Sequence, residues 1–254
     1  MKHKKINAII LAAGEGTRLR PYTLDYPKCM VEIDGKSLID RQLDVLEHER
    51  INDIIIIGGY KIEMLKGKGD RLKENPRYFE TNMVWTLFSA NEELTGELIV
   101  SYGDIVYSKE ILETLLNSTS DISVIIDQDW ETYWRARSDN PLDDAETLRL
   151  TEDGRIIEIG QKPESIEEIQ GQYIGLIKLT AFGVSQIKAV FQTALENGSM
   201  LGKSLENSYM TDLIQATINA GIDVTSVPVK GGWVEVDTID DMKATITSRR
   251  LKMI

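Results

Sequence analysis

Short apolar runs alternate with stretches of helical periodicity along most of the chain. Several of these runs are apolar at nearly every position, which is typical of parallel strands that are covered on both faces. Gly58-Gly59 ends the clearest of them, and Gly103-Asp104 follows another. The predicted strands are residues 7–11, 54–57, 98–101, 123–127, 173–179 and 224–229.

Helical patterns separate these runs. Ser37 precedes one of them, with Asp40 three residues later, and this spacing is typical of a helix N-terminus. The predicted helices start at Ser37 and 239 and cover about 84–93, 110–117, 182–196 and 210–220. The alternation of strands and helices predicts an α/β fold with a doubly wound, mostly parallel (mixed) sheet of the Rossmann-like type.

The pattern changes character between residues 128 and 172. A turn at 151–155 separates the short apolar segments 148–150 and 156–159, which predicts a hairpin. There is no long linker, low-complexity stretch or internal repeat. We therefore expect a single domain, residues 1–254, with 128–172 as an insertion over the sheet on the acceptor side.

Composition and charge narrow the classes of partner. No apolar run approaches the roughly 18 residues that a membrane span needs, and the formal net charge of -12 disfavours nucleic acid and anionic membranes. The basic start, residues 1–5, leads into an apolar run that ends in a glycine-rich turn, and we interpret it as a strand and not a signal peptide. Cys29 is the single cysteine, so a reducing, cytoplasmic location is expected. The oligomeric state is left open, with a homodimer among the options.

The strongest chemical signal is the glycine-rich turn after the first predicted strand. Its sequence is LAAGEGTRLRP over residues 11–21, followed by Pro27 and Lys28. Glycines let backbone N–H groups approach phosphate oxygens closely. Arg18 can form a fork on a phosphate, and Lys28 adds a point charge. The turn matches neither a P-loop nor the G-x-G-x-x-G fingerprint, whose third glycine is replaced here by Leu19.

This string resembles the signature L-A-A-G-x-G-[ST]-R-L-x-P-x-T-x-x-x-P-K of the sugar-phosphate nucleotidyltransferase superfamily. Every position is matched, Thr23 included. Over nearly the whole chain the sequence is more similar to the small CTP-dependent cytidylyltransferases, which act on phosphocholine, phosphonates or phosphorylated amino-acid-like compounds, than to the sugar enzymes. The resemblance implies that the turn wraps a nucleoside triphosphate. The nucleotide-binding set that it implies is Leu11, Ala12, Ala13, Gly14, Gly16, Thr17, Arg18, Lys28, Asn82 and Asp104.

Two aspartates at the ends of predicted strands are candidates for a metal site. Mg²⁺ in nucleotide enzymes prefers one or two carboxylates together with phosphates and waters. Among 41 acidic residues, strand-end carboxylates also arise by chance. The resemblance implies that Asp104 and Asp237 hold the Mg²⁺ cofactor, with Glu235 and Asp240 as the nearest alternatives to Asp237.

The acceptor side departs from the sugar enzymes. Gln161-Lys162-Pro163 stands where those enzymes carry Glu-Lys-Pro, so the resemblance implies that Lys162 contacts the acceptor phosphate. The glutamate that they turn to the sugar is Gln161 here, and this weighs against a hexose phosphate. Residues 75–85 resemble the loop of the phosphocholine-type enzymes. Asn82 in this loop is a candidate to contact the base or ribose, and a helix cap is an equally good interpretation.

Three aromatic residues lie close together with acidic neighbours. Trp130, Tyr133 and Trp134 could bind the ammonium group of an acceptor through their ring faces. The same helical spacing fits a core cluster, so both interpretations stay open. Asp143 and Asp144 are weaker candidates for an amine, because a solvated acidic turn explains them as well.

The function predicted from these features is Mg²⁺-dependent transfer of CMP from CTP to a small non-sugar phosphate or phosphonate, with release of pyrophosphate. An acceptor phosphate is mostly ionised at pH 7, since its second pKa is about 6, so no general base is required. The predicted catalytic residues are Arg18, Lys28 and Lys162. One alternative is a uridylyl- or thymidylyltransferase acting on a sugar 1-phosphate. An alternative of another class is a non-catalytic nucleotide-binding regulatory module.

Overall fold

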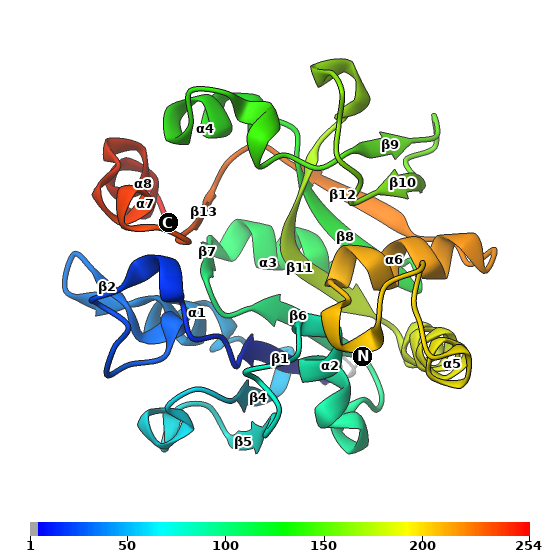
Figure 1. Ribbon diagram of the computed structural model, residues 1–254, viewed down its shortest axis with the longest axis horizontal. Coiled ribbons are helices and arrows are strands. Elements are labelled where there is room, and N and C mark those ends of the chain that lie inside the picture. The colour runs from blue at the N-terminus through cyan, green and yellow to red at the C-terminus, as the bar shows by residue number, and fades with distance from the viewer. Residues whose placement is uncertain (1–4) are drawn as a thin grey trace.

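The computed structural model describes residues 5–254, and a seven-stranded sheet forms its centre (Figure 1). Residues 1–4 of the basic start, His3 among them, lie outside the described residues. The strands occur in the order β12-β8-β11-β6-β1-β4-β5, and β11 alone among the seven is antiparallel to its neighbours. Their bounds are β1 (Ile6–Ala12), β4 (Ile51–Gly58), β5 (Arg71–Glu74), β6 (Leu98–Tyr102), β8 (Ile122–Asp127), β11 (Gln172–Leu179) and β12 (Thr225–Val229). The predicted mixed, doubly wound α/β sheet is confirmed.

Both faces of the sheet are covered, which explains the uninterrupted apolar runs. Ile9 and Ile10 are adjacent in β1 and fully buried, but they belong to different core clusters because successive side chains of a strand point to opposite faces. The helices α1 (Leu38–Leu46), α3 (Lys109–Leu116) and α4 (Trp130–Arg137) pack in the cluster with Ile10. The helices α2 (Met83–Ser89), α5 (Ala181–Asn197) and α6 (Met210–Asn219) pack in the cluster with Ile9.

The predicted helix boundaries agree with the structure except at two places. The Ser37 side chain caps α1 by accepting a hydrogen bond from the Asp40 amide at 3.1 Å, as predicted. Helix α2 ends at Ser89, because Ala90 leaves the helical conformation, and a separate 3-10 turn replaces its predicted end. The last predicted helix is two short ones, α7 (Ile239–Lys243) and α8 (Thr245–Leu251), since Ala244 between them is extended.

Smaller elements complete the chain. The predicted hairpin is confirmed as β9 (Leu148–Leu150) and β10 (Ile156–Ile159), which lie beside α6 in Figure 1. Two further antiparallel pairs are β2 (Glu32–Ile33) with β3 (Lys36–Ser37) and β7 (Ile105–Tyr107) with β13 (Trp233–Glu235). The 3-10 turns are η1 (Thr17–Leu19), η2 (Lys28–Met30), η3 (Ile62–Leu65), η4 (Asn91–Glu93), η5 (Pro141–Asp143), η6 (Ile166–Glu168) and η7 (Leu205–Asn207). Within residues 5–254, no helix has the length and apolar character needed to cross a membrane.

Candidate active site

A cavity of about 260 Å³ opens at the carboxyl ends of β1 and β6, where ligands of open α/β sheets bind. All ten residues of the nucleotide-binding set line it, and Asp237 joins them. Sequence reasoning missed several further lining residues. Tyr102 ends β6 directly before the Gly103-Asp104 turn, so its place at a strand end could have marked it.

The glycine-rich loop is closed by its own side chains. Gly16 has a φ of 64°, a left-handed conformation that favours glycine, and a Cβ atom there would lie 3.0 Å from the Lys28 side chain. The buried Thr23 hydroxyl donates to the Gly16 carbonyl at 2.7 Å, which explains the threonine of the motif. Gly14 has open space around it, so the cavity side of this loop is free for a ligand.

Tight backbone contacts bring the two candidate aspartates together. The Gly103 amide donates to the Leu11 carbonyl at 2.9 Å, and a Cβ on Gly103 would lie only 2.7 Å from that oxygen, so a glycine is required there. Asp104 therefore emerges beside the end of β1. On the other side, the Val236 amide donates to the Asp104 carbonyl at 3.1 Å, and Asp237 follows directly.

Lys28 lies between these aspartates. Its Nζ is 2.5 Å from Asp104 Oδ2 and also forms an ion pair with Asp237 Oδ1. Burial alone would lower the pKa of Lys28, but the two carboxylates reverse this effect and raise it. Burial would likewise raise the pKa of Asp237, and the Lys28 charge instead lowers it. Arg18 Nη2 lies 3.2 Å from Asp237 Oδ1 while 62% of the arginine side chain stays exposed, so its guanidinium remains available at the cavity mouth.

Three carboxylates could hold a hard cation here. Oxygen atoms of Asp104, Glu235 and Asp237 lie within 4.8 Å of one another. Asp104 Oδ1 is buried and has no hydrogen-bond partner, so it is free to act as a ligand. A set of carboxylate oxygens suits Mg²⁺. The alternative Asp240 is exposed on α7 and outside this group, whereas Glu235 belongs to it.

Asn82 is positioned by the loop that precedes α2. The fully buried Asn75 side chain organises this loop by donating to the hydroxyls of Thr81 and Thr86 at 3.0 Å each. Asn82 is the N-cap residue of α2, but its side chain makes no capping hydrogen bond and lines the cavity. The structure thus agrees with a ligand contact better than with a cap.

Lys162 lies outside the cavity. Its Nζ donates to the backbone carbonyls of Leu142 and Asp143, the latter at 2.8 Å, and it does not line the cavity. The carbonyls at the end of η5 bind the ammonium group in this structure, so the predicted contact with an acceptor phosphate would require Lys162 to leave them. Gln161 is exposed beside it. Asp143 and Asp144 are also exposed, as expected of a solvated turn.

The aromatic residues of α4 are part of the core. Trp130, Tyr133 and Trp134 are at most 5% exposed, and none of them lines the cavity. Cations of the chain itself cover the Tyr133 ring, since the guanidinium of Arg250 lies 4.0 Å and that of Arg137 5.0 Å from its centre. Acceptor binding by these faces, as predicted, would require displacement of both arginines, so the core interpretation holds.

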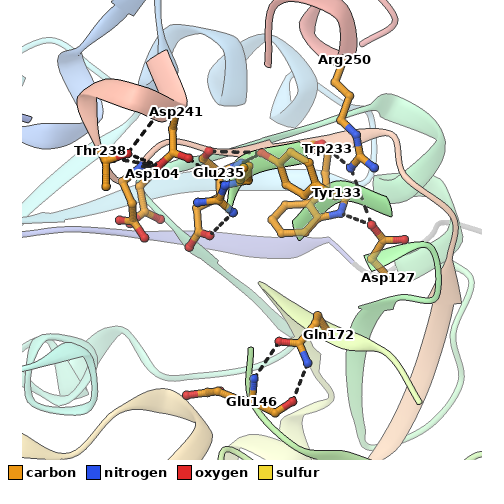
Figure 2. A network of polar contacts seen from close by, with 12 residues as sticks. Asp104, Asp127, Tyr133, Glu146, Gln172, Trp233, Glu235, Thr238, Asp241 and Arg250 are labelled. Atoms are coloured by element: carbon orange, nitrogen blue, oxygen red, sulfur yellow. Dashed lines mark hydrogen bonds and ion pairs between the residues drawn. The ribbon is translucent and has the colours of Figure 1, made fainter. Parts of the chain in front are cut away.

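One carboxylate on the far side of the site was missed by sequence reasoning. Figure 2 shows Glu146 and Gln172 on the opposite side of the view from Asp104 and Glu235, and neither residue lines the cavity. Gln172 binds the Glu146 backbone through its side-chain amide, with the Glu146 amide donating to Oε1 at 3.1 Å. Burial, with a contribution from the negative charge of Asp212, raises the pKa of Glu146 to about 7.

Comparisons with known proteins agree with this geometry. The family model described as the MobA-like NTP transferase domain matches residues 8–158. The chain is 38% identical to CTP:phosphoglutamine cytidylyltransferase of Campylobacter jejuni over 95% of its own length and 99% of that protein. It is 40% identical to choline-phosphate cytidylyltransferase of Streptococcus pneumoniae over 45% of this chain and 52% of that one.

Among solved structures, the CTP:phosphocholine cytidylyltransferase of Streptococcus pneumoniae superposes with a TM-score of 0.76. The sequence identity is 25%, and the alignment covers 96% of this chain and 99% of the other. The similarity in fold thus includes the elements on both sides of the cavity.

Proposed function

The chain belongs to the MobA-like NTP transferase domain family and is a nucleotidyltransferase, and from this premise we propose that it transfers CMP from CTP to a small non-sugar phosphate or phosphonate. The reaction depends on Mg²⁺ and releases pyrophosphate. The observation that carries the proposal is the convergence of Arg18, Lys28, Asp104 and Asp237 in the cavity that the glycine-rich loop lines. These four residues are the charged groups that a triphosphate and its metal need, and the chain retains all of them, which argues against a non-catalytic regulatory module.

Each group has a role that follows from its position. The open backbone at Gly14 allows close approach of phosphate oxygens, and Arg18 presents its exposed guanidinium to the departing pyrophosphate. Lys28 neutralises charge deeper in the cavity. Mg²⁺ held by Asp104 and Asp237 would polarise the α-phosphate when bound. The acceptor phosphate attacks the α-phosphorus without a general base, so alignment and charge neutralisation supply the catalysis.

The acceptor is proposed to carry an ammonium group. The relatives named above act on phosphoglutamine and choline phosphate, which both contain one. With the α4 rings buried, Glu146 is the best candidate to face it. Its carboxylate has no hydrogen-bond partner among residues 5–254, and Figure 2 shows Glu146 on the opposite side of the view from Asp104. An ammonium group would compensate the burial of this charge.

A grid of substrates tests the proposal. CTP, UTP and dTTP are each combined with phosphocholine, an aminoalkyl phosphonate, a phosphorylated glutamine and glucose 1-phosphate, and pyrophosphate release is measured. We expect CTP with one of the aminated acceptors to give the highest kcat/KM. Faster reaction of glucose 1-phosphate with UTP or dTTP than of every aminated acceptor with CTP would replace this proposal by the sugar-phosphate alternative.

Arg18 is expected to tolerate lysine poorly. A guanidinium binds two phosphate oxygens in a fork, and an ammonium group cannot reproduce this geometry, so Arg18→Lys should lower kcat/KM for CTP nearly as much as Arg18→Ala, by roughly 10- to 100-fold. Arg20→Lys is the matched control, because Arg20 lies in the same loop but pairs with Glu15 at the surface. Full activity of Arg18→Lys would show that Arg18 acts through its charge alone.

A further inference from the structure

Helix α4 does not line the cavity, but it holds the strand that leads to Asp237. The Tyr133 hydroxyl accepts a hydrogen bond from the Glu235 amide at 3.1 Å and lies 3.3 Å from the Glu235 carbonyl, to which it donates. One turn further on, at the end of α4, Arg137 extends toward the same strand and is only 7% exposed. Helix α4 is thereby bound to the strand that carries Glu235 and leads to Asp237.

Arg137 forms two charged hydrogen bonds with residues on either side of Asp237. Its Nη1 donates to Glu235 Oε2 at 3.1 Å, and its Nε donates to Asp241 Oδ1 at 2.8 Å. Such charge-assisted contacts from a planar guanidinium fix both the distance and the direction of their acceptors. The two acidic side chains flanking Asp237 are therefore held by a single cation.

Asp241, which Arg137 holds in place, in turn holds the backbone of Asp237. While Asp241 Oδ1 binds Arg137, Oδ2 accepts hydrogen bonds from the backbone amides of Asp237 at 3.0 Å and Thr238 at 2.8 Å. Figure 2 shows Asp241, Thr238, Glu235 and Asp104 gathered at one end of the network. The backbone of Asp237 is thus fixed by a carboxylate that Arg137 itself fixes.

Arg137 also balances charge. Burial would lower the pKa of Arg137, but Glu235 and Asp241 raise it, so the guanidinium stays charged. Without Arg137, Glu235 and the buried Asp241 would lose their hydrogen-bonded cation next to two other carboxylates, and like charges left unpaired in this way repel one another.

We propose that Arg137 is a positioning residue for the metal-binding carboxylates, holding Asp237 through Asp241 and Glu235 directly. This inference rests on the proposed function, in which Asp104 and Asp237 hold Mg²⁺. Residues that bind and orient metal ligands commonly change metal affinity by about 10- to 100-fold when they are replaced. Arg137 touches neither the cavity nor a reacting group.

Arg250 provides a matched control. Its guanidinium covers the same Tyr133 ring and is similarly buried, but it donates to the Trp233 carbonyl at 3.2 Å and lies 3.7 Å from Asp127 and 3.8 Å from Asp129. It forms no hydrogen bond or ion pair with Glu235 or Asp241. Arg137→Lys and Arg250→Lys thus both disturb a cation over the Tyr133 ring, and only the first disturbs Glu235 and Asp241. Arg135→Ala is a surface control on the same helix.

The experiment measures Mn²⁺ binding to the nucleotide-free protein by electron paramagnetic resonance, together with the Mg²⁺ dependence of turnover. We expect Arg137→Lys to weaken Mn²⁺ binding about 3- to 10-fold and Arg137→Ala at least about 10-fold. Arg250→Lys and Arg135→Ala should stay within twofold of the wild type. Added methylguanidinium should restore part of the affinity of Arg137→Ala.

Different results would contradict the positioning role of Arg137 and the metal site itself. Wild-type Mn²⁺ affinity in Arg137→Lys and Arg137→Ala would overturn the positioning role, and so would an equal loss in Arg250→Lys. If Arg137→Ala does not fold, the comparison of the two lysine variants still decides. Absence of Mn²⁺ binding to an active wild type would instead overturn the metal site of the proposed function, and the inference with it.

Discussion

Replacement of Asp104 or Asp237 by asparagine is expected to lower turnover by roughly 100-fold or more, while the protein stays folded. Each change removes one negative charge from the three carboxylates of Asp104, Glu235 and Asp237. One oxygen of this group, Asp104 Oδ1, is buried without a hydrogen-bond partner. Loss of one metal-supported interaction costs several kcal/mol of transition-state stabilisation, and each 1.36 kcal/mol corresponds to a factor of ten in rate. Asparagine keeps the shape and one oxygen acceptor, so Lys28 retains a polar neighbour on both sides.

The measurement is kcat as a function of Mg²⁺ concentration, with circular dichroism and Tm to verify the fold. Asp240→Asn is the matched control, because Asp240 is close to Asp237 in the sequence but exposed on α7. We expect it to behave like the wild type. Near-normal Mg²⁺-dependent turnover of Asp104→Asn or Asp237→Asn would remove that residue from the proposed metal site.

Lys28→Met is expected to lower turnover to a similar degree, but with the opposite effect on the metal. Lys28 Nζ occupies the space between Asp104 and Asp237, so the lysine and a cation compete for the same carboxylates. Its loss leaves two largely buried carboxylates without their cation, which should lower the Tm of the metal-free protein by roughly 5 to 10 °C. Turnover should fall about 100-fold, since the triphosphate loses a buried positive charge.

Thermal denaturation with and without Mg²⁺ distinguishes this variant from the aspartate variants. We expect Mg²⁺ to raise the Tm of Lys28→Met more than that of the wild type, because the ion replaces the missing charge. Asp104→Asn and Asp237→Asn should instead respond less than the wild type. Lys36→Met, which removes an exposed ion pair with Asp44, serves as the control. An equal Mg²⁺ response of Lys28→Met and the wild type would contradict competition for the carboxylates.

The sheet was predictable because its strands are encoded by neighbouring residues. A strand such as β4, with isoleucine at four successive positions 54–57, is apolar on both faces and must be covered on both. The glycine-rich loop is local as well. Gly14, Gly16, Arg18 and Lys28 lie within one short segment, so their spacing alone indicates phosphate binding, and the resemblance carried by this string led to the confirmed family.

The acceptor side was not predictable in the same way. Trp130, Tyr133 and Trp134 have a helical spacing that is identical for a helix facing a ligand and for one facing the core. Only the positions of Trp233, Arg137 and Arg250 decide between them, and these pack against the rings in the structure. Lys162 was similarly ambiguous, because the carbonyls that bind it belong to a turn about twenty residues earlier in the chain.

The sequence by itself thus determined six of the seven strands of the central sheet, the helices and the glycine-rich loop, since each depends on residues that are close together in the chain. Only the tertiary structure decided which carboxylates meet. Asp104 and Asp237 are joined through the pairing of β7 with β13, and Arg137 reaches Glu235 and Asp241 from helix α4, about a hundred residues earlier in the chain. The periodicity of the sequence does not encode such contacts, because they depend on how separate elements pack. Burial of a charged group is favourable only when its partner of opposite charge is also in place.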